Sequence, residues 1–244
     1  MVILHGLFGI SDNWAGLAKQ WSEEFTVYAV DLRNHGQSPH SDEWNYAAMA
    51  EDIVELIADE KLNDIVLLGH SMGGKTGMRL AIDYPNALSK LIVADIAPRQ
   101  YPPHNTEVVN ALLQVNLNEI TARKDAEAVL RPLLRDESTI QFLLKNLYWR
   151  ENTNGDKRLD WRFNLDVISK NMDEVYSPTQ PQGVCETETL FIRGSKSHYI
   201  MAEDEADIRV QFPNSQIVTV ENAGHWVHAE KPQEVYALVK EFAQ

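Results

Sequence analysis

Residues 69–73 read Gly69-His70-Ser71-Met72-Gly73 and stand between two segments of different character. The apolar run Ile65–Leu68 before them is typical of a buried strand, and Gly73–Tyr84 after them has the spacing of a helix. A serine between two such glycines, in this context, indicates a sharp turn that lifts its hydroxyl above a sheet. The flanking glycines permit the turn, since side chains there would collide with neighbouring backbone. The pattern predicts Ser71 as a nucleophile.

The same alternation of apolar runs and helical patterns extends through most of the chain, which is typical of βαβ units around a parallel sheet. Because the runs lack polar alternation, we expect helices on both faces of that sheet. The expected strands are Val2–Leu4, Thr26–Val30, Ile65–Leu68, Leu91–Ala94, Thr189–Ile192 and Gln216–Val220. The expected helices are Asn13–Ser22, Tyr46–Glu60, Gly73–Tyr84, Ala202–Gln211 and Gln233–Phe242. The predicted class is α/β. Since a strand begins at Val2, one or two N-terminal edge strands are expected to be absent.

The alternation stops between Pro98 and Gly183, where the sequence is mostly helical. Asn154-Gly155 within it predicts a hairpin turn. An insert between two strands lies over the carboxyl edge of a sheet, where open α/β folds bind ligands. We therefore expect residues 98–183 to form a helical cap over a pocket, and residues 1–97 and 184–244 to form the core. The alternative is a second helical layer without a substrate role. Four cap aromatics would suit an apolar acyl group or simply pack the cap: Phe142, Trp149, Trp161 and Phe163.

A serine hydroxyl is a weak nucleophile and needs a base within hydrogen-bond reach. Of the eight histidines, His225 fits best, because it follows the last expected strand in a loop that enters the C-terminal helix. This position also matches the order nucleophile, acid, base that accompanies a strand–turn–helix serine. His228, one turn further on, is the rival base. His70 is expected to be a packing or hydrogen-bonding neighbour.

The third residue of such an arrangement is an acid that orients the imidazole. The loop Arg193–Tyr199 is the usual source, but it contains no carboxylate. Asp95 stands at the end of the strand that follows the nucleophile, where its carboxylate could reach His225. We prefer Asp95 to the alternative, the group Glu203–Glu205 in the next expected helix.

Negative charge that develops on a carbonyl oxygen needs preorganised N–H donors. One expected donor is the backbone amide of Met72, directly after the nucleophile. The second is expected from the loop after the first strand, with Leu7 preferred and Phe8 as the alternative. His5 is expected to hold that loop down. The polar segment Asp31–Ser38 is expected to form a network that braces the turn at the nucleophile.

Composition excludes several other classes of function. The 244 residues suffice for one sizeable core, and 44% apolar with 24% charged residues is an ordinary globular mixture. A net charge of −14 disfavours a nucleic-acid partner. The lone cysteine, Cys185, permits no intrachain disulfide. No apolar stretch reaches the roughly 18 residues that span a bilayer, and no signal peptide is visible. Scattered histidines, and the lack of a GxGxxG or P-loop pattern, predict neither a metal nor a nucleotide cofactor.

Five motifs together resemble the bacterial YbfF-type esterases of the α/β-hydrolase superfamily, over essentially the whole chain. They are His5-Gly6-Leu7-Phe8-Gly9, Asp31-Leu32-Arg33-Asn34-His35-Gly36, Gly69-His70-Ser71-Met72-Gly73-Gly74-Lys75, Asp95-Ile96-Ala97-Pro98 and Gly224-His225-Trp226-Val227-His228-Ala229-Glu230-Lys231-Pro232. The resemblance implies an α/β-hydrolase fold with a helical cap, esterase or acyl-thioesterase activity and a cytoplasmic setting. It also implies that the acid lies in the Asp-Ile-Ala-Pro motif, and so supports Asp95.

The expected reaction is two-step acyl transfer through a Ser71, His225 and Asp95 triad, with a small-molecule acyl ester or thioester as substrate. One alternative keeps the fold and triad but catalyses C–C bond hydrolysis, lyase or perhydrolase chemistry. The other is a binding module with little or no turnover. The sequence leaves the oligomeric state and the acyl-chain preference open.

Overall fold

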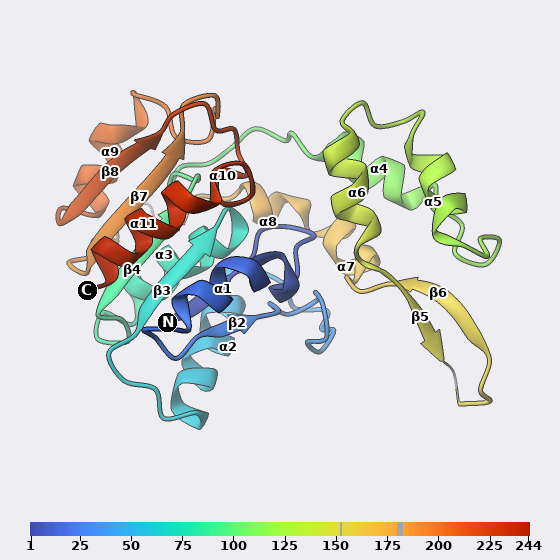
Figure 1. The fold of residues 1–244 in the computed structure, drawn as a ribbon, viewed down its shortest axis with the longest axis horizontal. Coiled ribbons are helices and arrows are strands. Elements are labelled where there is room, and N and C mark those ends of the chain that lie inside the picture. Colours follow the sequence, from blue (N-terminus) through green and yellow to red (C-terminus); the bar gives the residue numbers. More distant parts are fainter. Residues whose placement is uncertain (152, 180–182) are drawn as a thin grey trace.

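A computed structural model describes residues 1–151, 153–179 and 183–244 (Figure 1). Its main sheet has six parallel strands in the order β2-β1-β3-β4-β7-β8. The strands are β1 (Val2–Leu4), β2 (Tyr28–Val30), β3 (Val66–His70), β4 (Lys90–Ala94), β7 (Glu188–Gly194) and β8 (Ser215–Val220). Each coincides with a predicted strand to within a few residues, and the α/β class is confirmed.

Helices cover both faces of the sheet, because each strand sends alternate side chains to opposite sides. One face packs on α1 (Ala15–Trp21), preceded by the short 3-10 helix η1 (Ser11–Trp14), and on α10 (Val227–Glu230) and α11 (Pro232–Ala243). The other packs on α2 (Tyr46–Asp59), α3 (Met72–Asp83) and α9 (Asp204–Gln211). In β1, Ile3 belongs to the first core, whereas Val2 and Leu4 belong to the second. This explains the continuous apolar runs in the sequence.

The chain between β4 and β7 forms a mostly helical insert, most of which extends to one side of the sheet (Figure 1, green through yellow to light orange). It contains α4 (Thr106–Leu113), α5 (Arg123–Leu130), α6 (Glu137–Leu144), α7 (Leu165–Lys170) and α8 (Met172–Tyr176). An antiparallel hairpin of β5 (Leu147–Glu151) and β6 (Lys157–Trp161) turns near Gly155, which has a φ of +86°. The predicted hairpin is therefore present. The cap limits of 98 and 183 stay a prediction, and residues 180–182 lie outside the described residues.

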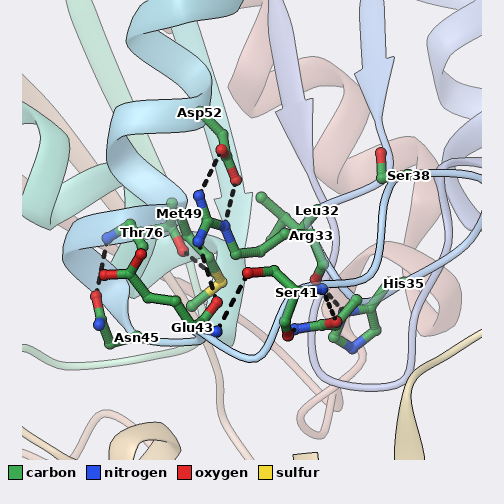
Figure 2. A network of polar contacts seen from close by, with 12 residues as sticks. Leu32, Arg33, His35, Ser38, Ser41, Glu43, Asn45, Met49, Asp52 and Thr76 are labelled. Atoms are coloured by element: carbon green, nitrogen blue, oxygen red, sulfur yellow. Dashed lines mark hydrogen bonds and ion pairs between the residues drawn. The ribbon is translucent and has the colours of Figure 1, made fainter. Parts of the chain in front are cut away.

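The loop after β2 is tied to α2 by a network of polar contacts (Figure 2). Arg33 contacts both carboxylate oxygens of Asp52 at 2.6 Å and donates to the Glu43 carbonyl at 3.0 Å. Asn34 is fully buried and makes a two-way contact with the backbone of Ser41, at 2.9 Å in each direction. These contacts satisfy the buried polar groups of the loop and fix its path beside the carboxyl edge of the sheet.

Candidate active site

Ser71 occupies a strained turn between β3 and α3. Its φ and ψ are +53° and −115°, outside the regions that non-glycine residues normally adopt. The neighbouring backbone leaves no space for side chains at either flanking glycine. A Cβ on Gly69 would lie 2.2 Å from the Gly73 carbonyl oxygen, and one on Gly73 would lie 2.5 Å from that of Leu4. The Ser71 N–H donates to Ala94 at 3.0 Å, so β4 holds the strained residue in place.

His225 and Asp95 form the central contact of the site. His225 Nδ1 lies 2.8 Å from Asp95 Oδ2, although 130 residues separate the two in sequence. The Asp95 side chain is fully buried, and that of His225 is 25% exposed. Because Nδ1 donates to the carboxylate, Nε2 is the ring nitrogen free to accept a proton. Ser71 and His225 line the same cavity.

The segment Arg193–Tyr199 at the end of β7, which lacks a carboxylate, contributes donors to Asp95 instead. The Gly194 amide donates to Asp95 Oδ1 at 3.0 Å, and the Ser197 hydroxyl donates to Oδ2. Together with His225, these donors surround a buried carboxylate that would otherwise be costly to desolvate. The missing acid is visible in the sequence of this segment, whereas the contact between Ser197 and Asp95 is not.

The alternative acids have other partners. Asp204 forms an ion pair with Arg99 at 2.7 Å, and Glu205 forms one with Arg193 at 2.7 Å. Glu203 is exposed. The carboxylate that contacts His225 is therefore the one preferred from the sequence.

The two neighbouring histidines occupy positions unlike that of His225. His70 Nε2 donates to the His225 carbonyl at 2.9 Å, so His70 is the hydrogen-bonding neighbour expected from the sequence. His228 stacks on Trp14, with ring centroids 4.1 Å apart, and within the described residues its Nδ1 has no hydrogen-bond partner. Burial lowers the pKa of His228 to about 3 and holds that of His70 well below its usual range.

Two buried histidines hold the loop after β1. His5 donates from Nδ1 to the Gly6 carbonyl at 2.8 Å and accepts the Leu32 amide on Nε2 at 3.0 Å. The Phe8 amide donates to Nε2 of His35 at 3.2 Å. Burial lowers the pKa of His35 to about 3 and that of His5 below its usual value, so both rings are neutral acceptors at pH 7.

The polar segment 31–38 acts on this same loop. Asp31 Oδ1 accepts the Ser11 amide at 2.7 Å, and Oδ2 accepts the Gln37 amide at 2.9 Å. From the connection between α6 and β5, Asn146 donates to the Phe8 carbonyl at 2.8 Å. The expected bracing network thus supports the loop after β1. It reaches the nucleophile turn through that loop, where the Gly73 amide donates to the His5 carbonyl at 3.1 Å.

A cavity of about 670 Å³ lies between this loop and the insert. Its wall near Ser71 includes the apolar residues Leu7, Phe8 and Phe142. The polar side chains that line it come partly from the loop before α6 and from α6 itself. They include Asn13, Asp136, Ser138, Thr139, Gln141, Lys145 and Glu230. A cavity of this size and mixture suits a small molecule with an apolar part and a polar part.

Of the four insert aromatics considered from the sequence, Phe142 alone lines this cavity. Trp161 and Phe163 stack on each other, with centroids 5.2 Å apart, and are buried in the core. Trp149 is 56% exposed on the hairpin. The spacing of these four aromatics in the sequence does not indicate which of them lines the cavity, because that depends on how the insert folds back onto the sheet.

Met72 directly follows the nucleophile in the sequence and is buried at the first position of α3.

Among the described residues, no cluster of histidine, cysteine and carboxylate side chains could hold a metal ion. In the same residues, no helix is long and apolar enough to cross a membrane.

A strained serine at a strand-to-helix turn of a parallel sheet, in one cavity with the histidine of a histidine–aspartate pair, defines the α/β-hydrolase class. Residues 1–232 match the family model described as alpha/beta hydrolase fold, and the chain belongs to this family.

Known members of the family are similar to this chain over almost its whole length. Mouse sn-1-specific diacylglycerol lipase ABHD11 is 39% identical over 99% of this chain and 80% of its own. Esterase YbfF of Escherichia coli is 34% identical over 99% of this chain and 92% of its own. A solved structure described as a marine microorganism esterase has a TM-score of 0.93 and 36% identity, and covers 99% of this chain and 94% of its own. The resemblance drawn from the sequence motifs is therefore confirmed.

Proposed function

We propose that the chain is a serine hydrolase that cleaves carboxylic esters through Ser71, His225 and Asp95. Carboxylic ester hydrolysis is the activity that its relatives support, since they are named esterases and lipases. The observation that carries the assignment of residues is the 2.8 Å contact between His225 Nδ1 and buried Asp95, beside a strained serine in one cavity.

In the first step, Ser71 Oγ forms a bond to the substrate carbonyl carbon as His225 Nε2 takes the hydroxyl proton. The carbonyl electron pair moves to the oxygen and then returns, and the bond to the leaving group breaks. The leaving alcohol or thiol takes its proton from His225. Water then attacks the acyl-enzyme, with His225 again as base, and releases the acid and Ser71. Asp95 stays ionised throughout and stabilises the imidazolium.

The amides of Leu7 and Met72 are the proposed donors to the oxyanion. Met72 follows the nucleophile at the N-terminus of α3, where amides are free of helical partners. In the loop after β1, the Phe8 amide already donates to His35. This leaves Leu7, which lines the cavity, as the loop donor.

The proposed substrates are small acyl esters and acyl thioesters, because the acyl-enzyme step is the same for both leaving groups. The apolar wall of Leu7, Phe8 and Phe142 suits the acyl chain. A net charge of −14 supports the prediction that nucleic acid is not a partner. The cytoplasmic setting stays a prediction from the resemblance.

A series of p-nitrophenyl esters and acyl-CoA thioesters of increasing chain length tests the proposal, with Ser71→Ala as blank. Wild type should turn over at least one acyl class, and Ser71→Ala should lose that activity. Near-normal turnover by Ser71→Ala would overturn the assignment. A fluorophosphonate label on Ser71 without turnover of any ester or thioester would favour the binding module. Turnover confined to C–C, lyase or perhydrolase substrates would favour those chemistries.

A further inference from the structure

Tyr199 lies face to face on the imidazole of His225. The ring centroids are 3.7 Å apart and the ring planes differ by 16°. Tyr199 comes from the loop after β7, two residues beyond Ser197, and it also lines the cavity. A stacked aromatic ring this close restricts how the imidazole can tilt, which neither the hydrogen bond to Asp95 nor the tilted contact with the His70 ring, at 4.7 Å and 41°, does to the same degree.

The backbone of Tyr199 completes a closed ring of contacts around the acid. Its amide donates to Ser197 Oγ at 3.2 Å, and the Ser197 hydroxyl donates to Asp95 Oδ2. The same Oδ2 accepts the proton of His225 Nδ1, and His225 stacks on Tyr199. The tyrosine is therefore coupled to the base both through its ring and through the carboxylate.

The phenol of Tyr199 is fixed by His104, in the segment that leads into α4. His104 Nδ1 donates to the Pro102 carbonyl at 2.8 Å, so its Nε2 is the acceptor for the Tyr199 hydroxyl at 2.6 Å. Burial lowers the pKa of His104 and raises that of Tyr199, which favours this neutral pairing.

Tyr101 holds the backbone of Tyr199 at its carbonyl group. Its hydroxyl accepts the Ala97 amide at 2.8 Å and donates to the Tyr199 carbonyl. The buried ammonium of Lys75 lies 4.8 Å from the centre of the Tyr101 ring and donates to the Arg99 carbonyl at 2.9 Å. The tyrosine that stacks on His225 is thus fixed at its amide, its carbonyl and its hydroxyl.

We propose that Tyr199 is a positioning residue for His225. Its ring holds the imidazole in the orientation for proton transfer and its π face stabilises the imidazolium, while His104 fixes the ring from the first segment of the insert. The inference rests on the proposed function of His225 as base. It assigns Tyr199 a part in turnover rather than in substrate affinity, although the residue lines the cavity.

Three substitutions separate the ring from the hydroxyl. Tyr199→Leu removes the stack and should lower kcat by about 10- to 100-fold, the scale expected from a misplaced catalytic group, with little change in KM. Tyr199→Phe keeps the stack and should restore most of kcat. His104→Ala removes the acceptor of the phenol together with the edge-on contact of the His104 ring at 5.2 Å, and it should keep most of kcat because the stack on His225 remains. Tyr236→Leu is the matched control, because Tyr236 also stacks on an aromatic ring, Trp21, at 6.1 Å and 16°, on the other face of the sheet; it should keep wild-type kcat.

Wild-type kcat in Tyr199→Leu would overturn the inference. So would a raised KM with unchanged kcat, which indicates substrate binding, or an equal loss in Tyr199→Phe, which indicates a role of the hydroxyl. Ser71→Ala is measured in parallel. Activity in that variant overturns the proposed function, whereas an inactive Ser71→Ala beside a fully active Tyr199→Leu overturns only the role of Tyr199.

If Tyr199→Leu does not fold, NMR of histidine-labelled protein carries the test. Stacking should shift the His225 Cε1 proton upfield in wild type and in Tyr199→Phe, with His225→Gln used to assign the signal. A signal at the position of an unstacked histidine in either folded protein would overturn the inference.

Discussion

Ser197 and His225 share a single acceptor, the Oδ2 atom of Asp95. The aspartate belongs to the end of β4, the serine to the loop after β7 and the histidine to the loop after β8. These strands are neighbours in the sheet, and their parallel pairing brings the three carboxyl ends to one edge. The acid therefore accepts a hydrogen bond from the segment Arg193–Tyr199, which has no acid of its own.

Asp95→Asn should lower kcat by about three to four orders of magnitude, because an amide cannot hold the Nδ1–H tautomer of His225 as a carboxylate does. Ester hydrolysis under saturating substrate measures the loss. Asp204→Asn, which replaces one of the alternative acids, should keep kcat near the wild-type value. An active Asp95→Asn beside an inactive Asp204→Asn or Glu203→Ala would contradict the assignment of the acid.

Ser197→Ala should lower kcat by about tenfold and the free energy of unfolding by about 1–3 kcal/mol, because a buried carboxylate loses one donor. Ser197→Thr keeps the hydroxyl and should restore both quantities. Steady-state kinetics and urea unfolding of the two variants check this. Unchanged kinetics and stability in Ser197→Ala would show that the hydroxyl contact contributes nothing.

Stability should fall as the pH drops below about 6.5, because burial lowers the pKa of His35 to about 3. Repulsion from His5 and His40, once these rings are protonated, lowers this pKa further, whereas Asp31 and the Arg33 carbonyl raise it. Between those pH values the unfolded state binds the proton and the folded state does not, so acidification favours unfolding. Each unit of pH below 6.5 should cost about 1.4 kcal/mol for this residue.

His35→Gln should reduce that dependence, since glutamine can accept the Phe8 amide but does not titrate, whereas the other buried histidines with lowered pKa values remain. Urea unfolding of both proteins at pH 7 and pH 5 gives the two differences to compare. The wild-type loss over this interval should exceed that of the variant by about 2 kcal/mol. Equal losses would show that His35 does not remain neutral in the folded protein.

Gly73→Ala should destabilise the fold by about 3 kcal/mol or more, because the new Cβ meets the Leu4 carbonyl oxygen at 2.5 Å and that of His5 at 2.7 Å. Gly16→Ala is the matched control: it lies on α1 with nothing within 4 Å of its Cβ, and it should gain about 0.5–1 kcal/mol. Thermal unfolding of both variants and of wild type measures these changes in stability. If Gly73→Ala were as stable as wild type, the turn would have more space than its contacts indicate.

The sequence alone determined those features whose signal is local. A strand, a glycine turn and a helix within 20 consecutive residues predicted the position of Ser71, and apolar runs predicted the six strands in the correct places. Asp95 and His225 could be selected because Asp95 directly follows one strand and His225 lies in the loop after another, and parallel strands bring such positions to one edge. The preference for Asp95 also needed the absence of an acid in the loop Arg193–Tyr199.

Only the tertiary structure decided which side chains complete the site. Ser197 lies 102 residues from Asp95 in sequence, and Tyr199 lies 95 residues from His104. No periodicity links such pairs, since their contact depends on the pairing of β7 with β4 and on the path of the insert back to the sheet. The same holds for Phe142, which lines the cavity while Trp161 and Phe163 pack inside. The position of the nucleophile turn is thus indicated by a local sequence pattern, whereas the contacts that hold the turn, the acid and the base depend on long-range strand pairing, which brings distant segments together.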